Sequence, residues 1–408
     1  MKTLLQINTN VGWNSTGRIA EDIGKMAIER GWLSTIAYGR NMNGIPASSS
    51  QLVRIGNNRD IILHGLSTRI FDKHGLSSKN ATLNLIKRIE EIRPDIIQLH
   101  NIHGYYLNYP ELFAYLARTG IPVVWTLHDC WPFTGHCAYF DMADCRKWLN
   151  GCNRCPLSRM YPGSFLMDNS SKNYRLKKEV FTSLDNLHIV TVSKWLKEVV
   201  ERSFLEKYNT YVIYNGIDPV ELPKRKIKKE KLILGAASKW DPRKGLDTFI
   251  ALRKMLSPDY RMVLIGLSSS QCRSLPGDIE GIGRINERNA LNDWYRRAAV
   301  FVNPSLSETL SITNIEAQAC GTPVVAYDSG GMRETISRKT GLLVHPGDVS
   351  GIADAVRRIV NSPAEFTPDN CRSHVEAKFN KTNNFRSYID LYDSIYEARN
   401  VKIPSLMV

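Results

Sequence analysis

The fold is constrained most by an alternation of short apolar runs, rich in Val, Ile and Leu, with amphipathic stretches of helical period. This alternation is typical of β-α-β units, which build parallel sheets covered by helices. In the first half of the chain the predicted strands are 3–8, 34–38, 96–100, 123–127, 188–192 and 212–214, and the predicted helices are 17–30, 81–92 and 110–118. We therefore expect an α/β fold built on parallel sheets.

The same rhythm begins again in the second half of the chain. The predicted strands there are 232–236, 262–265, 300–303, 324–327 and 342–344, and the predicted helices are 245–256, 289–297, 312–320 and 350–361. A charged run between the halves, residues 223–231, is typical of a solvated connector. A chain of 408 residues is long enough for two domains. We predict doubly wound, Rossmann-like domains at 1–222 and 229–373, followed by a C-terminal segment, 374–408, with one helix over about 374–398.

The composition, with 43% hydrophobic and 23% charged residues, is that of a soluble globular protein. Lys and Arg exceed Asp and Glu by 54 − 40 = 14, and such a charge favours phosphates, acidic lipid or nucleic acid. We find neither an aromatic-interleaved RNA motif nor a zinc-finger pattern, so no nucleic-acid partner is expected. No run of 18 apolar residues is present, and the N-terminus turns polar too early for a signal peptide. We expect a cytoplasmic protein that contacts the inner face of the cytoplasmic membrane peripherally.

Two carboxylates flank the start of a predicted helix in the segment 305–326. Glu308 precedes this helix and Glu316 lies eight residues further on, after a strand and before a Gly-Thr-Pro turn. A strand–loop–helix opening presents backbone N–H groups to an anion, and carboxylates accept hydrogen bonds from hydroxyl groups. A sugar nucleotide offers both. The alternative is that both are ordinary helix-start glutamates favoured by the helix dipole.

Three cations surround a turn that follows another predicted strand and opens a helix. Lys239, Arg243 and Lys244 are placed to meet a diphosphate, with Arg giving bidentate contacts and Lys a compact charge. Fixed cations stabilise the negative charge that develops on such a leaving group. The alternative is a basic helix start on the surface.

Small and polar residues in the first half mark a second candidate region. The loop 10–17 ends at Gly17, where the first helix is predicted to begin. Its small residues would let the backbone approach a ligand closely. The alternative is a plain β-α turn. His100, His103, His128 and Asp129 follow two strands, whose carboxyl ends meet at one edge of a parallel sheet. Each histidine could instead be a structural residue.

Four cysteines fall within nineteen residues, in the pattern Cys137-x7-Cys145-x6-Cys152-x2-Cys155. Four thiols in a reduced compartment suit a tetrahedral structural zinc ion, and the last pair has metal-ligand spacing. We expect an insertion at about 130–156 ordered by zinc. Free thiols, disulfides and an iron–sulfur cluster are the alternatives.

The second half of the chain resembles the retaining glycosyltransferases of family four, which have the GT-B fold. The resemblance rests on Glu308, Glu316, Ala317, Gly321, Pro323, Val324, Gly330, Gly331, Glu334 and Gly341-Leu-Leu-Val. It implies two Rossmann-like domains facing a central cleft. The first would lie on the acceptor side, the second would bind a nucleoside-diphosphate sugar, and the C-terminal helix would cross back to the first domain.

The resemblance also implies roles for single residues. Glu308 would contact the hydroxyls of the donor sugar, Glu316 the ribose, and the backbone N–H groups near Leu310 and Ser311 the phosphates. Lys244 matches a cation that neutralises the leaving diphosphate, and His128 matches a histidine near the anomeric centre. No Asp-x-Asp motif is present, and no catalytic metal is expected.

The segment 128–140 resembles a subgroup of these enzymes linked to exopolysaccharide assembly of the colanic-acid type. We therefore expect a retaining hexosyltransferase that acts on an oligosaccharide acceptor, attached to a membrane lipid, in capsule, lipopolysaccharide or exopolysaccharide synthesis. Two rivals remain open. One is a nucleotide-sugar epimerase of the same fold, and the other is a non-catalytic, zinc-stabilised protein that binds polyanions.

Overall fold

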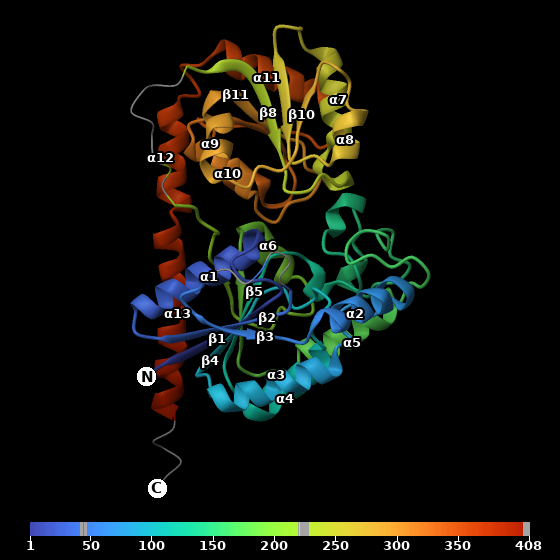
Figure 1. Cartoon of the computed structure of the whole chain (residues 1–408), viewed down its shortest axis with the longest axis vertical. Coiled ribbons are helices and arrows are strands. Elements are labelled where there is room, and N and C mark those ends of the chain that lie inside the picture. The colour runs from blue at the N-terminus through green and yellow to red at the C-terminus, as the bar shows by residue number, and fades with distance from the viewer. Residues whose placement is uncertain (41–43, 45–46, 219, 221–227, 403–408) are drawn as a thin grey trace. The chain divides into compact units, whose positions relative to one another are not determined.

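The computed structural model describes residues 1–40, 44, 47–218, 220 and 228–402. The chain divides into two compact units. Unit 1 comprises Met1–Ile213 and Asn384–Val408, and unit 2 comprises Tyr214–Asn383. Each unit is built on one sheet (Figure 1). Of the predicted connector, residues 223–227 lie outside the described residues.

The sheet of unit 1 has seven parallel strands in the order β3-β2-β1-β4-β5-β6-β7. The strands are β1 (Thr3–Asn8), β2 (Leu33–Tyr38), β3 (Gln51–Arg54), β4 (Ile96–Leu99), β5 (Val123–Leu127), β6 (Leu187–Thr191) and β7 (Thr210–Val212). The helices are α1 (Asn14–Glu29), α2 (Asn58–Phe71), α3 (Lys79–Ile92), α4 (Tyr109–Thr119), α5 (Ser170–Phe181), α6 (Lys194–Val200) and α13 (Lys381–Lys402), with short 3-10 turns η1 (Trp131–Phe133), η2 (Phe140–Ala143) and η3 (Lys147–Leu149).

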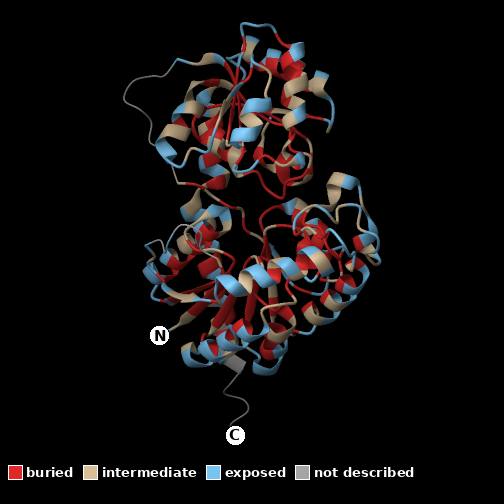
Figure 2. Cartoon of the chain, turned by 45° about the vertical axis from the view of Figure 1, so that its right-hand side comes forward, coloured by how far each residue is buried: buried red, intermediate tan, exposed pale blue. Residues whose placement is uncertain are grey.

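Both faces of this sheet are covered, which explains the continuous apolar runs of its central strands. Val124 of β5 belongs to a core that includes residues of α1 and α13. The neighbouring Trp125 points to the other face, where its ring contacts Phe113 of α4 and Phe181 of α5. Figure 2 shows the buried residues concentrated along the strands and on the helix faces next to them.

The sheet of unit 2 has six parallel strands in the order β10-β9-β8-β11-β12-β13. The strands are β8 (Glu230–Ala236), β9 (Arg261–Ile265), β10 (Glu280–Ile282), β11 (Ala298–Asn303), β12 (Val324–Tyr327) and β13 (Gly341–Val344). The helices are α7 (Leu246–Met255), α8 (Ser269–Ser274), α9 (Arg288–Arg297), α10 (Ile312–Ala319), α11 (Val349–Asn361) and α12 (Pro368–Phe379), with 3-10 turns η4 (Pro242–Lys244) and η5 (Gly330–Thr335). Residues of α7 and α11 form one core with the sheet, and residues of α9 and α10 form the other. The loops that follow β8 and β11 therefore emerge at the same edge, the carboxyl edge, of this parallel sheet.

The C-terminal segment differs from its prediction. Instead of one helix over 374–398, α12 ends at Phe379, Asn380 is extended with φ −66° and ψ 118°, and α13 begins at Lys381. Residues 374–383 belong to unit 2, and unit 1 resumes at Asn384. The first unit also ends at Ile213, earlier than the predicted boundary at 222. Among the helices of the described ranges, none has the length and hydrophobicity that a membrane span requires.

Candidate functional site

Three loops of unit 2, which follow β8, β11 and β12, are held together at the carboxyl edge of its sheet. Gly245, at the start of α7, has φ +71°, and a Cβ there would lie 2.5 Å from the carbonyl oxygen of Pro304. Gly330 has φ +54°, and a Cβ there would lie 2.2 Å from the carbonyl oxygen of Glu308. That oxygen accepts a hydrogen bond from the N–H of Gly331 at 2.8 Å. Glycine is therefore required at both positions for the backbone that presents Glu308.

Glu308 forms ion pairs with both cations of the basic turn. Its Oε1 lies 3.0 Å from Nη1 of Arg243 and is also paired with Nζ of Lys244. The side chains of Arg243, Lys244 and Glu308 are 10%, 18% and 11% exposed, so solvent screens the cluster little. The three groups carry a net charge of about +1 when all are ionised. This cluster can therefore attract a further anion.

The charges of this cluster set the pKa of Glu308. Burial acts to raise that pKa, but the charges and hydrogen bonds of Lys244 and Arg243 outweigh burial and hold it below the usual glutamate value. Glu308 is therefore a carboxylate at neutral pH, able to accept hydrogen bonds from hydroxyl groups. Arg243 also donates from Nη1 to the carbonyl oxygen of Ser307 at 2.8 Å, so it fixes the loop as well as supplying charge.

Helix α10 begins directly after the loop that carries Glu308. The Ser311 hydroxyl caps the helix by accepting from the N–H of Asn314 at 3.3 Å, and Asn303, the last residue of β11, donates to the same hydroxyl at 2.9 Å. Leu310 is buried beside this cap. The positive end of the α10 dipole thus lies next to the loop that carries Glu308.

Two further predicted residues of unit 2 lie outside the ion-paired cluster. Lys239 is exposed in the loop after β8, and none of the cluster's ion pairs described above includes it. Glu316 is half-buried on α10, where its Oε2 accepts from the hydroxyl of Tyr295 at 3.3 Å. Of the three predicted diphosphate cations, the structure thus brings Arg243 and Lys244 to Glu308.

In unit 1, His128 lies at the carboxyl end of β5 and belongs to a chain of hydrogen bonds. Its Nε2 lies 3.2 Å from Nδ1 of His100, whose Nε2 lies 3.2 Å from Oε1 of Gln6. The amide of Gln6 donates to the Ala20 carbonyl, so its oxygen faces His100 as an acceptor. This order places the proton of neutral His128 on Nε2. Burial lowers the pKa of His128 to about 4, so the ring is neutral at pH 7.

Asp129 pairs with a different histidine. Its Oδ2 lies 3.1 Å from Nε2 of His103, and its Oδ1 accepts from the N–H of Trp131 at 3.0 Å. The other ring nitrogen of His103 lies 3.1 Å from the hydroxyl of Tyr161. Tyr161 carried no signal in the sequence, because it lies 58 positions beyond His103. After β1, the neighbour of β4 in the sheet, Gly17 is buried in the first turn of α1, where a Cβ would lie 3.2 Å from the carbonyl of Asn10.

The cysteine-rich loop places its four predicted metal ligands around one small cavity. Cys137, Cys145, Cys152 and Cys155 all line it, and all four are free thiols. Hydrogen bonding from Cys137 lowers the pKa of Cys155 to about 7, whereas burial raises the pKa of Cys152 to about 11. Among the described residues, no three of these sulfur atoms lie within 4.8 Å of one another.

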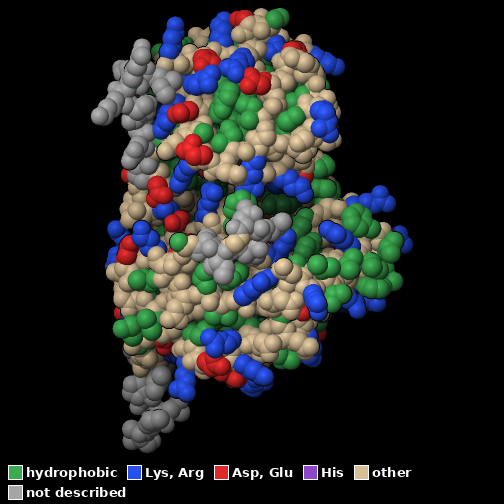
Figure 3. Space-filling view, in the orientation of Figure 1, with side chains coloured by type: hydrophobic (Ala, Val, Ile, Leu, Met, Phe, Trp, Pro, Cys, Tyr) green, Lys and Arg blue, Asp and Glu red, His purple; other side chains and the backbone are tan. Residues whose placement is uncertain are grey.

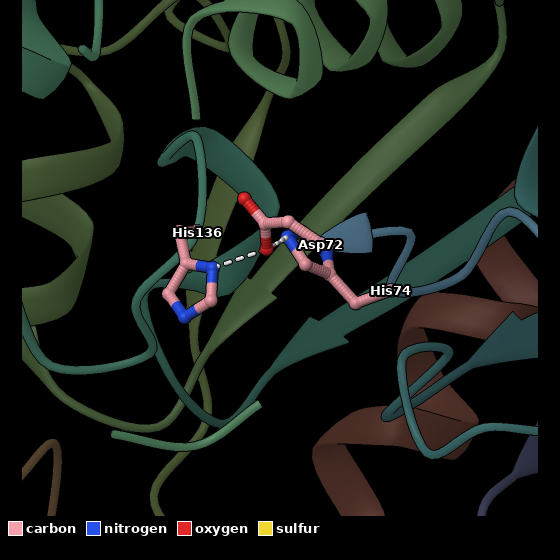
Figure 4. Close-up of side chains that lie close together, drawn as sticks. All are labelled: Asp72, His74 and His136. Carbon is pink, nitrogen blue, oxygen red and sulfur yellow. Dashed lines mark hydrogen bonds and ion pairs between the residues drawn. The ribbon is translucent and has the colours of Figure 1, made fainter. Parts of the chain in front are cut away.

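A group that does meet this distance consists of Asp72 and His74, which follow α2, and His136 of the same loop (Figure 4). All three side chains are buried, and Nδ1 of His136 lies 2.5 Å from Oδ1 of Asp72. Burial acts to lower the pKa of His136, but hydrogen bonding and charge from Asp72 raise it overall. The second oxygen of Asp72 accepts from the N–H of Asn169, and Nδ1 of His74 accepts from Trp131. These atoms are used in a hydrogen-bonded network that fixes the loop to the end of α2.

Two models of known protein families match most of the sequence. A model of glycosyltransferase family 4 matches residues 18–221, and a model of glycosyl transferases group 1 matches residues 230–362. A putative colanic acid biosynthesis glycosyl transferase of Escherichia coli K12 is 22% identical over 364 residues, 85% of this chain and 88% of that protein. An O-antigen chain mannosyltransferase of Salmonella typhimurium is 27% identical over 207 residues, 46% of this chain and 58% of that protein.

Solved structures share the fold over nearly the whole chain. Sucrose-phosphate synthase from Thermosynechococcus elongatus superposes with a TM-score of 0.69 at 18% identity, covering 98% of this chain and all of that one. The Anabaena protein HepE, solved in complex with UDP, gives a TM-score of 0.66 at 16% identity, covering 97% and 100%. The two parallel-sheet units and these neighbours show an α/β fold of the GT-B class, as predicted. The chain belongs to glycosyltransferase family 4 and is a glycosyltransferase.

Proposed function

We propose that this protein is a retaining hexosyltransferase, which moves a hexose from a nucleoside-diphosphate sugar to an oligosaccharide acceptor in cell-surface polysaccharide synthesis. The observation that carries the proposal is the cluster of Arg243, Lys244 and Glu308 beside the start of α10. It combines a buried and a half-buried cation for a diphosphate with a carboxylate for sugar hydroxyls. The named relatives in colanic acid and O-antigen synthesis support this class of acceptor, and the UDP bound by HepE supports this class of donor.

Each residue of the cluster has a proposed role. Lys244 and Arg243 stabilise the diphosphate as it leaves, together with the N–H groups near Leu310 and Ser311. Glu308 holds the hydroxyls of the donor sugar, and Glu316 those of the ribose. Lys239 is exposed beside the same turn and adds a further cation for the diphosphate. Two fixed cations supply the charge that a metal ion supplies elsewhere, so no catalytic metal is required.

Unit 1 contributes the acceptor side in this proposal. His128, neutral and held by His100, contacts the donor sugar near its anomeric centre through a hydrogen bond. Gly17 keeps the first loop close to the ligand. We assign no carboxylate nucleophile, since the leaving phosphate oxygen can take the proton of the attacking hydroxyl.

The test is a transfer assay with UDP-, GDP- and ADP-hexoses and oligosaccharide acceptors. The expected result is release of nucleoside diphosphate only with an acceptor, and a product whose new linkage keeps the anomeric configuration of the donor by NMR. A changed sugar nucleotide formed without acceptor would indicate an epimerase. No turnover with any donor, together with binding to polyanions, would indicate a binding protein. Either result, or an inverted linkage, would overturn the proposal.

We further propose that the acceptor is linked to a membrane lipid and that unit 1 contacts the membrane surface. An exposed apolar patch, the α2 surface, consists of Ile62, Leu63, Leu66, Phe71, Phe165, Leu166 and Met167. The part of this patch on α2 and the part at residues 165–167 are joined, since the N–H of Phe165 donates to the carbonyl of Arg69 at 2.8 Å. Figure 3 shows hydrophobic side chains gathered in this part of unit 1 with Lys and Arg around them.

The charge around the α2 surface favours an anionic bilayer. Arg59, Arg69 and Lys73 are exposed on or just after the same helix. Apolar side chains of this kind enter the interface of a bilayer while basic groups meet anionic headgroups. Leu63→Ser with Leu166→Ser should weaken co-sedimentation with phosphatidylglycerol vesicles at least about fivefold, since each leucine contributes buried apolar area. Leu343→Ser, an exposed leucine of unit 2, is the control. Equal sedimentation of all three proteins would contradict this assignment.

A further inference from the structure

The cysteine-rich loop between β5 and α5 contains a group of four cysteines for which glycosyl transfer has no evident use. From residue 128 to residue 169 it forms only short 3-10 turns, η1, η2 and η3. Loops of this length without longer elements are uncommon in compact domains and need their own means of support. Side chains from outside the loop hold it at four points between Trp131 and Trp148.

Buried polar groups hold the loop from outside. Lys177 of α5 donates to the carbonyls of Trp131 and Thr134 at 2.7 and 3.0 Å, and His136 is paired with Asp72. The hydroxyl of Tyr174 donates to the carbonyl of Trp148 at 3.0 Å. These contacts hold the loop around the cavity that the four cysteines line.

The thiols converge on one cavity from three turns of the loop. Its remaining wall is partly apolar, with Phe140 and Trp148, whose ring centroids lie 4.9 Å apart, and Pro156. An apolar wall around several thiols excludes competing water. The thiols of Cys137 and Cys155 are in hydrogen-bond contact.

Backbone N–H groups point at two of the sulfur atoms. The N–H of Leu157 donates to Cys155, and that of Gly135 donates to Cys152. Gly135 packs so closely that a Cβ there would lie 2.6 Å from the Cβ of Cys152 and 2.2 Å from the carbonyl oxygen of Ser170. N–H donors to sulfur stabilise thiolates, which are the form that binds metal, and they belong to the outer shell of metal–thiolate sites.

We propose that Cys137, Cys145, Cys152 and Cys155 bind one structural zinc ion within this cavity. Zinc prefers four thiolates at about 2.3 Å, which places the sulfur atoms about 3.8 Å apart. Among the described residues, no three of these sulfur atoms lie within 4.8 Å of one another, so the site closes only when the cysteine side chains rotate into the shared cavity. Zinc then supplies the internal support of the loop that carries the residues following His128.

The experiment measures zinc in full-length protein purified in reducing buffer without chelator, and it does not depend on glycosyl transfer. The expected content is about one zinc per chain in the wild type, and below about 0.1 in Cys152→Ser/Cys155→Ser. Cys272→Ser, a half-buried cysteine of unit 2, is the matched control and should keep its zinc. Zinc retained by the double variant would overturn the ligand assignment.

A second measurement uses only the wild type, so it remains informative if Cys152→Ser/Cys155→Ser fails to fold. Wild-type protein stripped of metal and loaded with Co²⁺ should show the visible bands of tetrahedral cobalt and sulfur-to-cobalt charge transfer. Native alkylation followed by mass spectrometry should label the four cysteines only after a chelator is added. Wild-type protein that holds no zinc, contains disulfides among these cysteines, or has the visible absorption of an iron–sulfur cluster would overturn the proposal.

Discussion

At the scale of single residues, the proposed donor chemistry depends on three side chains whose charges are interdependent. Glu308 stays ionised because Lys244 and Arg243 lie beside it, and each cation is in turn held by Glu308. Removing one partner of a buried pair leaves the other uncompensated. Changes here should therefore alter activity and stability together.

Glu308→Gln should lower kcat/KM at least about 100-fold, because a neutral amide accepts hydrogen bonds from sugar hydroxyls less strongly and no longer orders the two cations. It should also lower the free energy of unfolding at pH 7 by about 3 kcal/mol. Steady-state kinetics and urea unfolding check both. The control is Glu365→Gln, which changes an exposed glutamate. If Glu308→Gln had the same kcat/KM as Glu365→Gln, the assigned role of Glu308 would be refuted.

The stabilities of the wild type and Glu308→Gln should also depend differently on pH in the acid range. The pKa of Glu308 is held below its value in the unfolded chain, so its ionisation stabilises the fold above the ordinary glutamate pKa, and this contribution is lost as pH falls through the folded value. The stability of Glu308→Gln should therefore fall less steeply than that of the wild type as pH decreases below about 4.5. Parallel unfolding curves over that range would show that the carboxylate is not paired in solution.

His128 provides a second test at this scale. Because burial lowers its pKa to about 4, its ring resonances should not shift between pH 7 and 5.5, where an ordinary histidine titrates. NMR of labelled histidines, assigned with His128→Gln, measures this directly. Titration near pH 6.5 would contradict the buried hydrogen-bonded chain through His100.

At the scale of elements, the position of Glu308 depends on glycines in neighbouring turns. Gly330→Ala should lower stability by about 1 kcal/mol through its positive φ alone, with more from the clash with the Glu308 carbonyl. It should also lower kcat/KM about tenfold or more by moving Glu308. The control Gly347→Ala has φ +85° with nothing within 4 Å of its Cβ, so it should lose stability without losing activity. Equal effects of both substitutions would show that the loop does not position Glu308.

Many elements could be predicted from the sequence because their signal is local. β1, β5 and β12 have the predicted bounds, since buried parallel strands are mostly apolar. α2 was not predicted, because it turns Ile62, Leu63 and Leu66 outward and buries His64 and Thr68. Its apolar pattern therefore does not mark a core-facing side.

The site was predictable to the same extent. The segment from Asn303 to Glu316 is contiguous, so its motif shows in the sequence. The pairing of Asp129 with His103, and the pairing of both cations with one carboxylate, depend on packing between distant segments. Spacing along the chain does not show such partners.

At the scale of the whole molecule, α13 completes the core of unit 1 although it is the last element of the chain. Tyr392 is fully buried among residues of that core, and its hydroxyl donates to Gln98 of β4 at 2.9 Å. Unit 1 thus depends on both ends of the sequence.

Tyr392→Ala should lower the stability of unit 1 by about 3 kcal/mol, because it opens a cavity and leaves Gln98 without its donor. Hydrogen exchange followed by mass spectrometry should show faster exchange in peptides of the unit 1 sheet, with peptides of unit 2 unchanged. Ser394→Ala, on the exposed side of α13, should change neither unit. Exchange that rises only near α13 would show that the helix is not part of the core.

The most direct test of the account is calorimetric titration of nucleoside-diphosphate hexoses into the wild type, Lys244→Ala and the control Lys254→Ala, an exposed lysine at the end of α7. If the proposed donor site is correct, one donor binds the wild type and Lys254→Ala alike. Lys244→Ala should bind it at least about tenfold more weakly, since a charged hydrogen bond contributes about 1.5–3 kcal/mol. Equal affinity in Lys244→Ala, or no binding of any of these donors to the wild type, would contradict it.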